Sequence, residues 1–256
     1  MKKEVFAKKK FGQNFLHDNN IINKIVSIFD IFNQNVLEIG PGRGALTTKM
    51  LEKCAKVTSY EIDQDMVNVL NNLIDNQNFK LIHQDFLEAN LDQIDNSYLI
   101  ANIPYYITTD ILFKVFDHKD KFNGVLLMVQ KEVAQRICAK PNTYDYSKLS
   151  VSSQYLADCK IEFIVPASCF TPAPKVDSAI ISLRFKNNLE ELNWNELSEF
   201  FKLCFLARRK KLSYALKTKY APNLVLQVFN ELGLDDNTRI QQLTVDQIVL
   251  LYKLLK

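Results

Sequence analysis

Short apolar runs alternate with helical stretches along the chain up to about Arg184. Runs that are typical of buried strands lie at 35–39, 55–60, 79–84, 98–101 and 179–183. A helical pattern at 45–51 separates the first two of them. Strands that alternate with helices are typical of βαβ units. The pattern therefore predicts an α/β domain.

From Trp194 onward the apolar spacing becomes helical. Two apolar stripes result from this spacing. The first contains Leu197, Phe200, Phe201, Cys204 and Phe205, and the second contains Val245, Ile248, Val249, Tyr252 and Leu255. Such stripes more often form a packed core than a binding surface. The polar stretch 187–190 is the expected linker. We therefore expect an α/β domain at 1–186 and a small all-α domain at 187–256.

The composition is that of an ordinary globular protein, with 256 residues of which 47% are hydrophobic and 24% charged. The five cysteines are scattered without paired spacing, and the three histidines do not cluster. These features predict reduced thiols and no metal site. No apolar run is long enough to span a membrane, and the charged N-terminus lacks the apolar segment of a secretory signal. We expect a cytoplasmic protein without a membrane partner.

A glycine-rich turn, Gly40-Pro41-Gly42-Arg43-Gly44, joins the strand at 35–39 to the helix at 45–51. It resembles a dinucleotide-binding turn, but its spacing is Gly-x-Gly-x-Gly. Glu38 and Pro41 are more typical of sites for S-adenosyl-L-methionine than of pyrophosphate sites. The glycines allow the backbone to approach a ligand closely, so Gly40 and Gly42 are candidate cofactor-binding residues.

Acidic residues follow the next two predicted strands. Glu61 ends the strand at 55–60, where a carboxylate can accept hydrogen bonds from both ribose hydroxyls of an adenosyl group. Asp85 and Phe86 follow the strand at 79–84 and suit the amino group and the ring face of the cofactor adenine. Any one such carboxylate is more often a turn or helix cap, but their order along the chain favours a cofactor site.

The stretch Asn102-Ile103-Pro104-Tyr105 follows the apolar run at 98–101. Adenine N6 is a poor nucleophile because its lone pair is delocalised into the ring, so an enzyme that alkylates it must favour a tetrahedral nitrogen. The Asn102 side-chain oxygen and the Ile103 carbonyl can accept the amino hydrogens, and Tyr105 offers a ring for the base to stack on. Taken alone, the stretch is explained equally well as a turn after a buried strand.

With these features in order, the chain resembles the small-subunit ribosomal RNA adenine N6-dimethyltransferases over nearly all of its length. Further motifs that carry the resemblance lie at 10–18, 130–136 and 170–178. The resemblance implies an α/β, Rossmann-like S-adenosylmethionine-dependent methyltransferase domain with a small C-terminal all-α domain.

The activity that the resemblance implies is the dimethylation of N6 on two adjacent adenosines in the 3′-end hairpin of small-subunit rRNA, with a role in small-subunit assembly. In this family the positions of Asn14 and Leu16 touch the methionine part of the cofactor, which Asn102 also contacts. The position of Phe170 stacks on the target base opposite Tyr105. Asn102, Tyr105 and Phe170 are thus the expected catalytic residues, and Lys175 lies where it can contact phosphate.

The net charge is only +3, so RNA contacts must be sought in local clusters. Lys8-Lys9-Lys10 leads into the motif at 10–18, and Arg208-Arg209-Lys210-Lys211 lies in the predicted helical region. A lysine run is more often a solvated face, but four successive cations would surround a helix, so some must face a partner. With the resemblance, Arg208, Arg209, Lys210 and Lys211 are candidate contacts to rRNA in the pre-30S particle.

Three alternatives stay open. A DNA adenine methyltransferase shares the cofactor turn, but such enzymes usually carry a separate recognition domain. The erythromycin-resistance methyltransferases modify large-subunit rRNA with a similar site. The chain could also act chiefly as an assembly factor, although Asn102, Tyr105, Glu61 and Asp85 are intact. Two departures from the family pattern are Ser147, where glycine is usual, and Tyr214, where asparagine is frequent.

Overall fold

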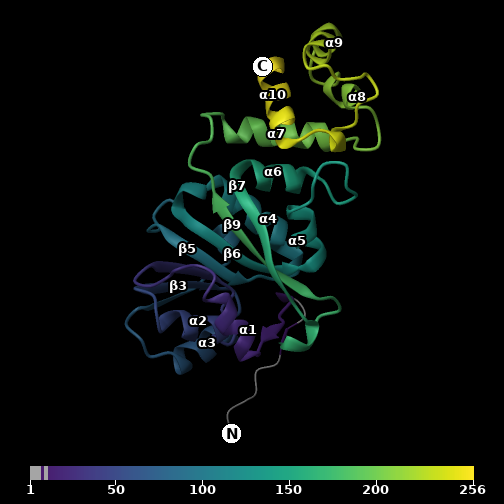
Figure 1. Ribbon diagram of the computed structural model, residues 1–256. Helices are drawn as coiled ribbons and strands as arrows, with labels where there is room; N and C mark the ends of the chain where they lie inside the picture. Colours follow the sequence, from purple (N-terminus) through teal and green to yellow (C-terminus); the bar gives the residue numbers. More distant parts are fainter. Residues whose placement is uncertain (1–6, 9–10) are drawn as a thin grey trace. The chain divides into compact units, whose positions relative to one another are not determined.

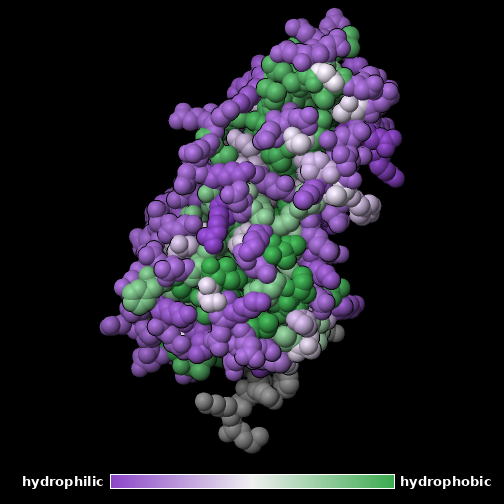
Figure 2. Space-filling view, viewed as in Figure 1, coloured by the Kyte–Doolittle hydropathy of each residue, from purple (hydrophilic) through white to green (hydrophobic). Residues whose placement is uncertain are grey.

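The computed structural model describes residues 7–8 and 11–256, and the chain forms two compact units (Figure 1). The first unit contains residues 1–134 and 160–185, and the second contains 135–159 and 186–256. Figure 2 shows a mostly hydrophilic surface on one face of each unit, with apolar side chains in patches between the polar ones.

The first unit is built around a seven-stranded sheet of order β4-β3-β2-β5-β6-β9-β7. The strands from β4 to β6 are parallel to their neighbours, whereas β9 is antiparallel to β6. A separate antiparallel pair joins β1 to β8. The strands are β1 Phe15–Leu16, β2 Asn35–Ile39, β3 Lys56–Glu61, β4 Phe79–His83, β5 Ser97–Asn102, β6 Phe122–Gln130, β7 Ala157–Val165, β8 Phe170–Thr171 and β9 Ser178–Phe185.

All five predicted strands are confirmed as β2, β3, β4, β5 and β9. Most of their apolar residues are buried, except in β4, which lies at the edge of the sheet. In β2 the four residues from Val36 to Ile39 are buried in succession, as expected for a strand covered on both faces. The predicted helix at 45–51 is α2, with the same bounds.

The helices of this unit are α1 Asn19–Ile25, α2 Ala45–Leu51, α3 Gln64–Leu73, α4 Thr108–Asp117 and α5 Lys131–Ile137, the last of which runs into the second unit. Ile22 of α1 and Met50 of α2 pack in one core with Val36 of β2 and Val57 of β3. Asp18 caps α1 by accepting hydrogen bonds from two backbone N–H groups of its first turn.

The second unit consists of α6 Lys148–Leu156, α7 Trp194–Phe205, α8 Leu212–Leu216, α9 Pro222–Glu231 and α10 Val245–Leu255. Both predicted stripes lie in or against its core: Leu197, Phe200, Phe201, Cys204, Ile248, Tyr252 and Leu255 are buried, and Phe205, Val245 and Val249 pack against them.

The second unit differs from the expected division at 186/187 because it also takes up residues 135–159. Tyr146 and Val151 are fully buried in the same core as Phe200 of α7. The Tyr146 hydroxyl donates a hydrogen bond to the Leu243 carbonyl at 3.0 Å. These apolar residues come from the α/β part of the sequence, so a contiguous division could not include them.

Candidate active site

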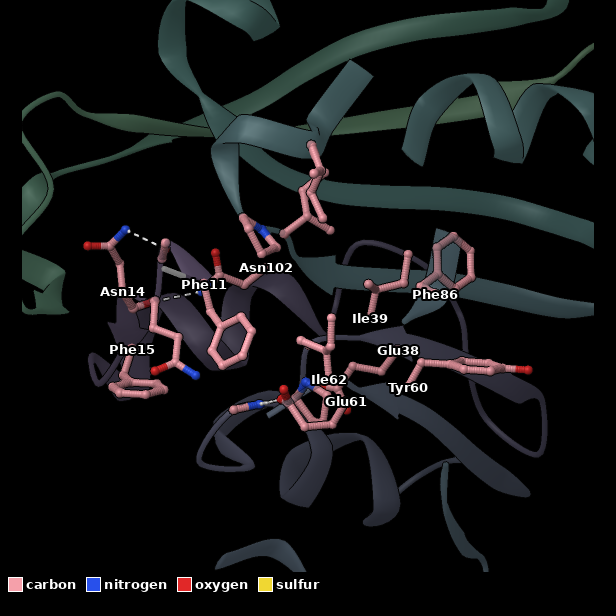
Figure 3. A pocket seen from close by; sticks show the side chains of 18 of the residues that line it. Phe11, Asn14, Phe15, Glu38, Ile39, Tyr60, Glu61, Ile62, Phe86 and Asn102 are labelled. Carbon is pink, nitrogen blue, oxygen red and sulfur yellow. Dashed lines mark hydrogen bonds between the residues drawn. The ribbon is translucent and has the colours of Figure 1, made fainter. Parts of the chain in front are cut away.

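A pocket opens at the carboxyl ends of β2, β3, β4 and β5 (Figure 3). The chain moves outward from β2 to β4 and returns to β5 on the other side of β2, so the pocket lies where the strand order reverses. The predicted site residues that line it are Asn14, Leu16, Gly40, Gly42, Glu61, Asp85, Phe86, Asn102 and Tyr105.

The turn after β2 requires glycine at three positions. Gly40, Gly42 and Gly44 have φ of +63°, +56° and +80°, a region that side chains with a Cβ rarely adopt. A Cβ on Gly42 would also lie only 3.1 Å from the ring of Phe15. The turn therefore brings bare backbone to the edge of the pocket, as the close approach of a cofactor requires.

Glu61 holds this turn against the end of β3. Its Oε2 accepts a hydrogen bond from the Gly42 N–H at 3.1 Å, and its Oε1 accepts one from the Asp63 N–H at 2.8 Å. Burial raises the pKa of Glu61, while the backbone donors act in the opposite direction. The fixed carboxylate lines the pocket and suits the ribose hydroxyls of an adenosyl group.

A second buried carboxylate, Glu38, lies beneath the turn. Its Oε2 accepts hydrogen bonds from the Thr47 hydroxyl at 2.7 Å and the Ser59 hydroxyl at 2.8 Å. Burial, together with the charge of Glu61, raises the pKa of Glu38 to about 7. Glu38 thereby connects β2 to α2 and β3 at the floor of the pocket.

Asp85 and Phe86 form the side of the pocket that follows β4. Asp85 Oδ1 accepts a hydrogen bond from the Leu87 N–H at 2.8 Å, so this carboxylate caps the turn, the common role for such a residue. Phe86 is buried and packs edge-on against Tyr60, with ring centroids 5.7 Å apart. Figure 3 shows Phe86 and Tyr60 across the pocket from Phe11 and Asn14.

Asn102, at the end of β5, is oriented by the N-terminal segment. Its side-chain Nδ2 donates a hydrogen bond to the Asn14 carbonyl at 3.1 Å. The amide oxygen of Asn102 therefore becomes the end of the side chain available to accept a hydrogen bond from a substrate. Leu16, two residues after Asn14, is buried in β1 and also lines the pocket.

Tyr105 begins the short helix that follows Pro104. Its hydroxyl makes a 2.6 Å hydrogen bond with the Ser178 hydroxyl at the start of β9. Burial raises the pKa of Tyr105, so the phenol stays neutral at physiological pH. The sequence did not indicate this role for Ser178, although Ser178 ends the recognised motif at 170–178.

The N-terminal segment is tied to the start of α3 by contacts that the sequence did not reveal. Asp63 accepts hydrogen bonds from the Lys8 ammonium at 2.6 Å and from Gln13 Nε2 at 2.9 Å. These contacts place Phe11 and Gln13 at the pocket wall. Lys9 and Lys10 of the predicted basic run lie outside the described residues.

Phe170 is the predicted site residue that does not line the pocket. It is only 3% exposed, pairs with Leu16 across the β1–β8 sheet and belongs to the core of the first unit. Cys169, beside it, is buried as well, and its Sγ lies 4.0 Å from Asp18 Oδ2. Lys175 is exposed in the loop between β8 and β9.

The basic cluster at 208–211 lies in the turn between α7 and α8, and the expectation that it surrounds a helix is wrong. Helix α7 ends at Phe205, and residues 206–209 form turns and not a continued helix. Arg208 Nη2 donates to the Thr143 carbonyl at 3.1 Å and also to the Tyr144 carbonyl. Lys211 pairs with Asp236 at 2.9 Å.

The five cysteines are free thiols. Among the residues that the structure describes, no group of three or more His, Cys, Asp or Glu is placed to hold a metal ion. No helix in that part of the chain is long and apolar enough to cross a membrane.

The fold and the pocket together define a Rossmann-like, S-adenosyl-L-methionine-dependent methyltransferase. The parallel strands reverse their order at the pocket, a glycine turn follows β2, and acidic residues lie at the ends of β3 and β4. A family model described as ribosomal RNA adenine dimethylase matches residues 5–256. The chain belongs to this family, and it is an rRNA adenine dimethyltransferase.

Relatives and solved structures agree with this assignment. The chain is 54% identical over 248 residues to the ribosomal RNA small subunit methyltransferase A of Mycoplasmopsis synoviae, covering 96% of each chain. It is 47% identical to the protein of the same name from Mycoplasmopsis pulmonis, covering 96% of this chain and 98% of the relative.

Among solved structures, a dimethyladenosine transferase from Plasmodium falciparum matches with a TM-score of 0.83 at 27% identity, covering 93% of this chain and 95% of the other. The 23S rRNA methyltransferase ErmE matches with a TM-score of 0.73 at 27% identity, covering 94% and 99%.

Proposed function

We propose that the enzyme dimethylates N6 of two adjacent adenosines in the 3′-end hairpin of small-subunit rRNA within a pre-30S particle, and so takes part in small-subunit assembly. The observation that carries the chemistry is the oriented Asn102 amide, whose Nδ2 is engaged by Asn14 while its oxygen is available at the pocket. The names of the relatives support the choice of subunit.

Asn102 and Ile103 act as acceptors in this proposal. The bound cofactor supplies an electrophilic methyl group on its sulfonium sulfur. Asn102 Oδ1 and the Ile103 carbonyl accept the two amino hydrogens of adenine, which favours a tetrahedral nitrogen and stabilises the positive charge that develops on N6 during in-line attack. The lost proton passes to water, and no strong base is needed.

Two aromatic rings hold the target base in this proposal. Tyr105 stacks on one face of the base, with its hydroxyl fixed by Ser178. Phe170 is the predicted partner on the opposite face. Because Phe170 is buried in the core, that role requires β8 to shift when the base enters. Extracting a loop base costs only a few kcal/mol, which favours a hairpin target.

The proposed cofactor contacts follow the order of the strands. Asn14, Leu16 and Asn102 hold the methionine part, the backbone at Gly40 and Gly42 approaches the ligand, Glu61 accepts from the ribose, and Asp85 and Phe86 bind the adenine. Lys175, Arg208, Arg209, Lys210 and Lys211 are the proposed RNA contacts. The cytoplasmic location expected from the sequence stays a prediction.

A transfer assay distinguishes this proposal from its rivals. The protein is incubated with labelled cofactor and one of three acceptors: undermethylated small subunits, large-subunit RNA or duplex DNA. We expect label on adenosines of the small subunit alone. Label confined to large-subunit RNA or to DNA would refute the proposed substrate, and binding without label would favour a pure assembly factor.

The Asn102→Ala variant tests the acceptor role. We expect methyl transfer to be abolished, because the amino group loses an acceptor that acts in the transition state. Cofactor affinity should fall far less than transfer, because Asn14 and Leu16 still hold the methionine part in this proposal. Calorimetric titration with S-adenosyl-L-methionine measures the affinity, and the labelled-methyl assay measures the transfer. Near-normal transfer in this variant would contradict the role. Asn68→Ala, on the exposed face of α3, is the control.

A further inference from the structure

Two exposed tyrosines flank the basic turn of the second unit. Tyr144 is 89% exposed in the loop before α6, and Tyr214 is 55% exposed on α8. An aromatic side chain normally buries most of its surface in a core or an interface. Water has access to both rings here, although a large apolar core lies in the same unit.

Each tyrosine is paired with a cation of the basic turn. The Arg208 guanidinium carbon lies 5.8 Å from the Tyr144 ring centroid, and the Lys210 ammonium lies 4.3 Å from that of Tyr214. Arg208 also donates hydrogen bonds to the carbonyls of Thr143 and Tyr144. The loop that carries Tyr144 is therefore fastened to the basic turn.

Some cations of this surface are paired with acidic residues of the protein, and others are exposed to solvent. Lys211 is paired with Asp236, which also accepts a hydrogen bond from the Ser213 hydroxyl. Arg209 and Lys210 are exposed, and neither has an acidic partner among the described residues. The surface thus combines two accessible aromatic faces with two cations that are available to a ligand.

We propose that Tyr144, Tyr214, Arg209 and Lys210 form a stacking surface for unpaired nucleotides of the RNA substrate. A nucleotide offers a flat base and an anionic phosphate. The two tyrosine rings offer faces on which bases can stack, and Arg209 and Lys210 offer positive charge for phosphate. A folded protein partner offers no comparable array of phosphates, so RNA fits the surface better. The proposal rests on the proposed rRNA substrate and adds a second site of contact on the other unit.

Binding of the full-length protein to fluorescein-labelled single-stranded RNA tests the proposal. The two ligands compared are an adenosine-rich RNA oligonucleotide and an abasic ribose-phosphate oligomer of equal length. The variant Tyr144→Ala with Tyr214→Ala should bind the RNA about tenfold or more weakly, because stacking is lost, and should bind the abasic oligomer as the wild type does. The variant Tyr144→Phe with Tyr214→Phe should bind like the wild type.

Phe32→Ala is the matched control, because Phe32 is a 67% exposed aromatic residue on the first unit. Circular dichroism of every variant checks the fold. RNA binding by the double alanine variant that equals that of the wild type would overturn the proposal, as would an equal loss with the abasic oligomer.

The labelled-methyl assay separates this inference from the proposed function. If the wild type methylates small-subunit rRNA and the tyrosine substitutions do not change RNA binding, the proposed stacking surface is refuted and the proposed function is not. If RNA binding depends on the tyrosines but no methyl group is transferred to the small subunit, the stacking surface is supported and the proposed substrate is refuted.

Discussion

At the scale of single residues, Asn102 is the side chain on which the proposed chemistry depends most directly. Its residue type and its place at the end of a strand could be predicted from the sequence. The hydrogen bond that orients it comes from Asn14, 88 residues earlier in the chain, and no local pattern specifies such a contact. Ser178 was missed for the same reason, since its importance arises from Tyr105.

Glu38 should make stability depend on pH. Burial raises the pKa of Glu38 to about 7, above that of an exposed glutamate, so the folded state binds more protons between the two values and stability falls as the pH rises through this window. Glu38→Gln should lose less stability than the wild type between pH 5 and pH 8, by on the order of 2 kcal/mol. Urea unfolding at both pH values measures this.

The control for this prediction is Glu88→Gln, which changes an exposed glutamate and should leave the pH dependence of the wild type unaltered. Parallel stability curves for the wild type and Glu38→Gln would show that Glu38 titrates normally in the folded protein.

Alanine substitutions at Gly42 and Gly233 distinguish the effect of backbone strain from that of a steric clash. Both have positive φ, +56° and +62°, but a Cβ would lie 3.1 Å from Phe15 at Gly42 and meet nothing within 4 Å at Gly233. Each alanine variant should lose about 1–2 kcal/mol through strain. Only Gly42→Ala should also weaken binding of S-adenosyl-L-methionine, measured by calorimetry. Equal cofactor affinity in both variants would argue against a cofactor role for the glycine turn.

At the scale of elements, β2, β3, β5 and β9 could be predicted because each is a short apolar run that the sheet buries, and the edge strand β4 because its residues still form such a run. The strands β6 and β7 of the same sheet were not predicted. The turn at 206–211 could not be predicted, since its cations carry no signal for the end of α7, and the helical periodicity resumes in α8. Ser147 shows why a departure from a family pattern can be harmless. Its φ of −150° is open to any residue, and its N–H donates to the Ser150 hydroxyl at the start of α6.

Asp63 connects two elements, the N-terminal segment and α3. Asp63→Asn keeps an oxygen for capping the Asp65 N–H but removes one of the two carboxylate charges that hold the Lys8 ammonium, the other being that of Asp65. We expect a higher KM for the cofactor with little change in kcat, because the pocket wall is held less firmly. Steady-state kinetics tests this, with Asp75→Asn, in the loop after α3, as the control. A selective fall in kcat would instead indicate a role in the chemical step.

At the scale of the whole molecule, the two units divide the work that we propose, with the methyl transfer in the first and RNA contacts in both. The two compact units do not follow one contiguous boundary, because residues 135–159 belong to the second unit and the chain returns to the first at Lys160. Tyr146 shows the physical reason, since it is fully buried among the C-terminal helices.

The salt dependence of RNA binding should report on the second unit. Arg208 holds the loop at 143–144, so a substitution there would change both the structure and the charge of this surface. Substitution of the exposed Arg209 and Lys210 tests the charge alone. Arg209→Ala with Lys210→Ala should weaken RNA binding and reduce the slope of log K against log salt by about 1–2. Lys202→Ala, paired with Glu199 on α7, is the control. An unchanged slope would assign the turn a structural role.

The hydrogen bond between Tyr105 and Ser178 spans 73 residues and joins the helix after β5 to the start of β9. A chain still being synthesised has the glycine turn, Glu61, Asp85 and Asn102 long before it has Ser178. All of these residues precede β9 in the chain, so the Tyr105 hydroxyl has no Ser178 partner until β9 has been synthesised. The order of translation thus separates the two halves of the site in time, and the stacking side is completed last.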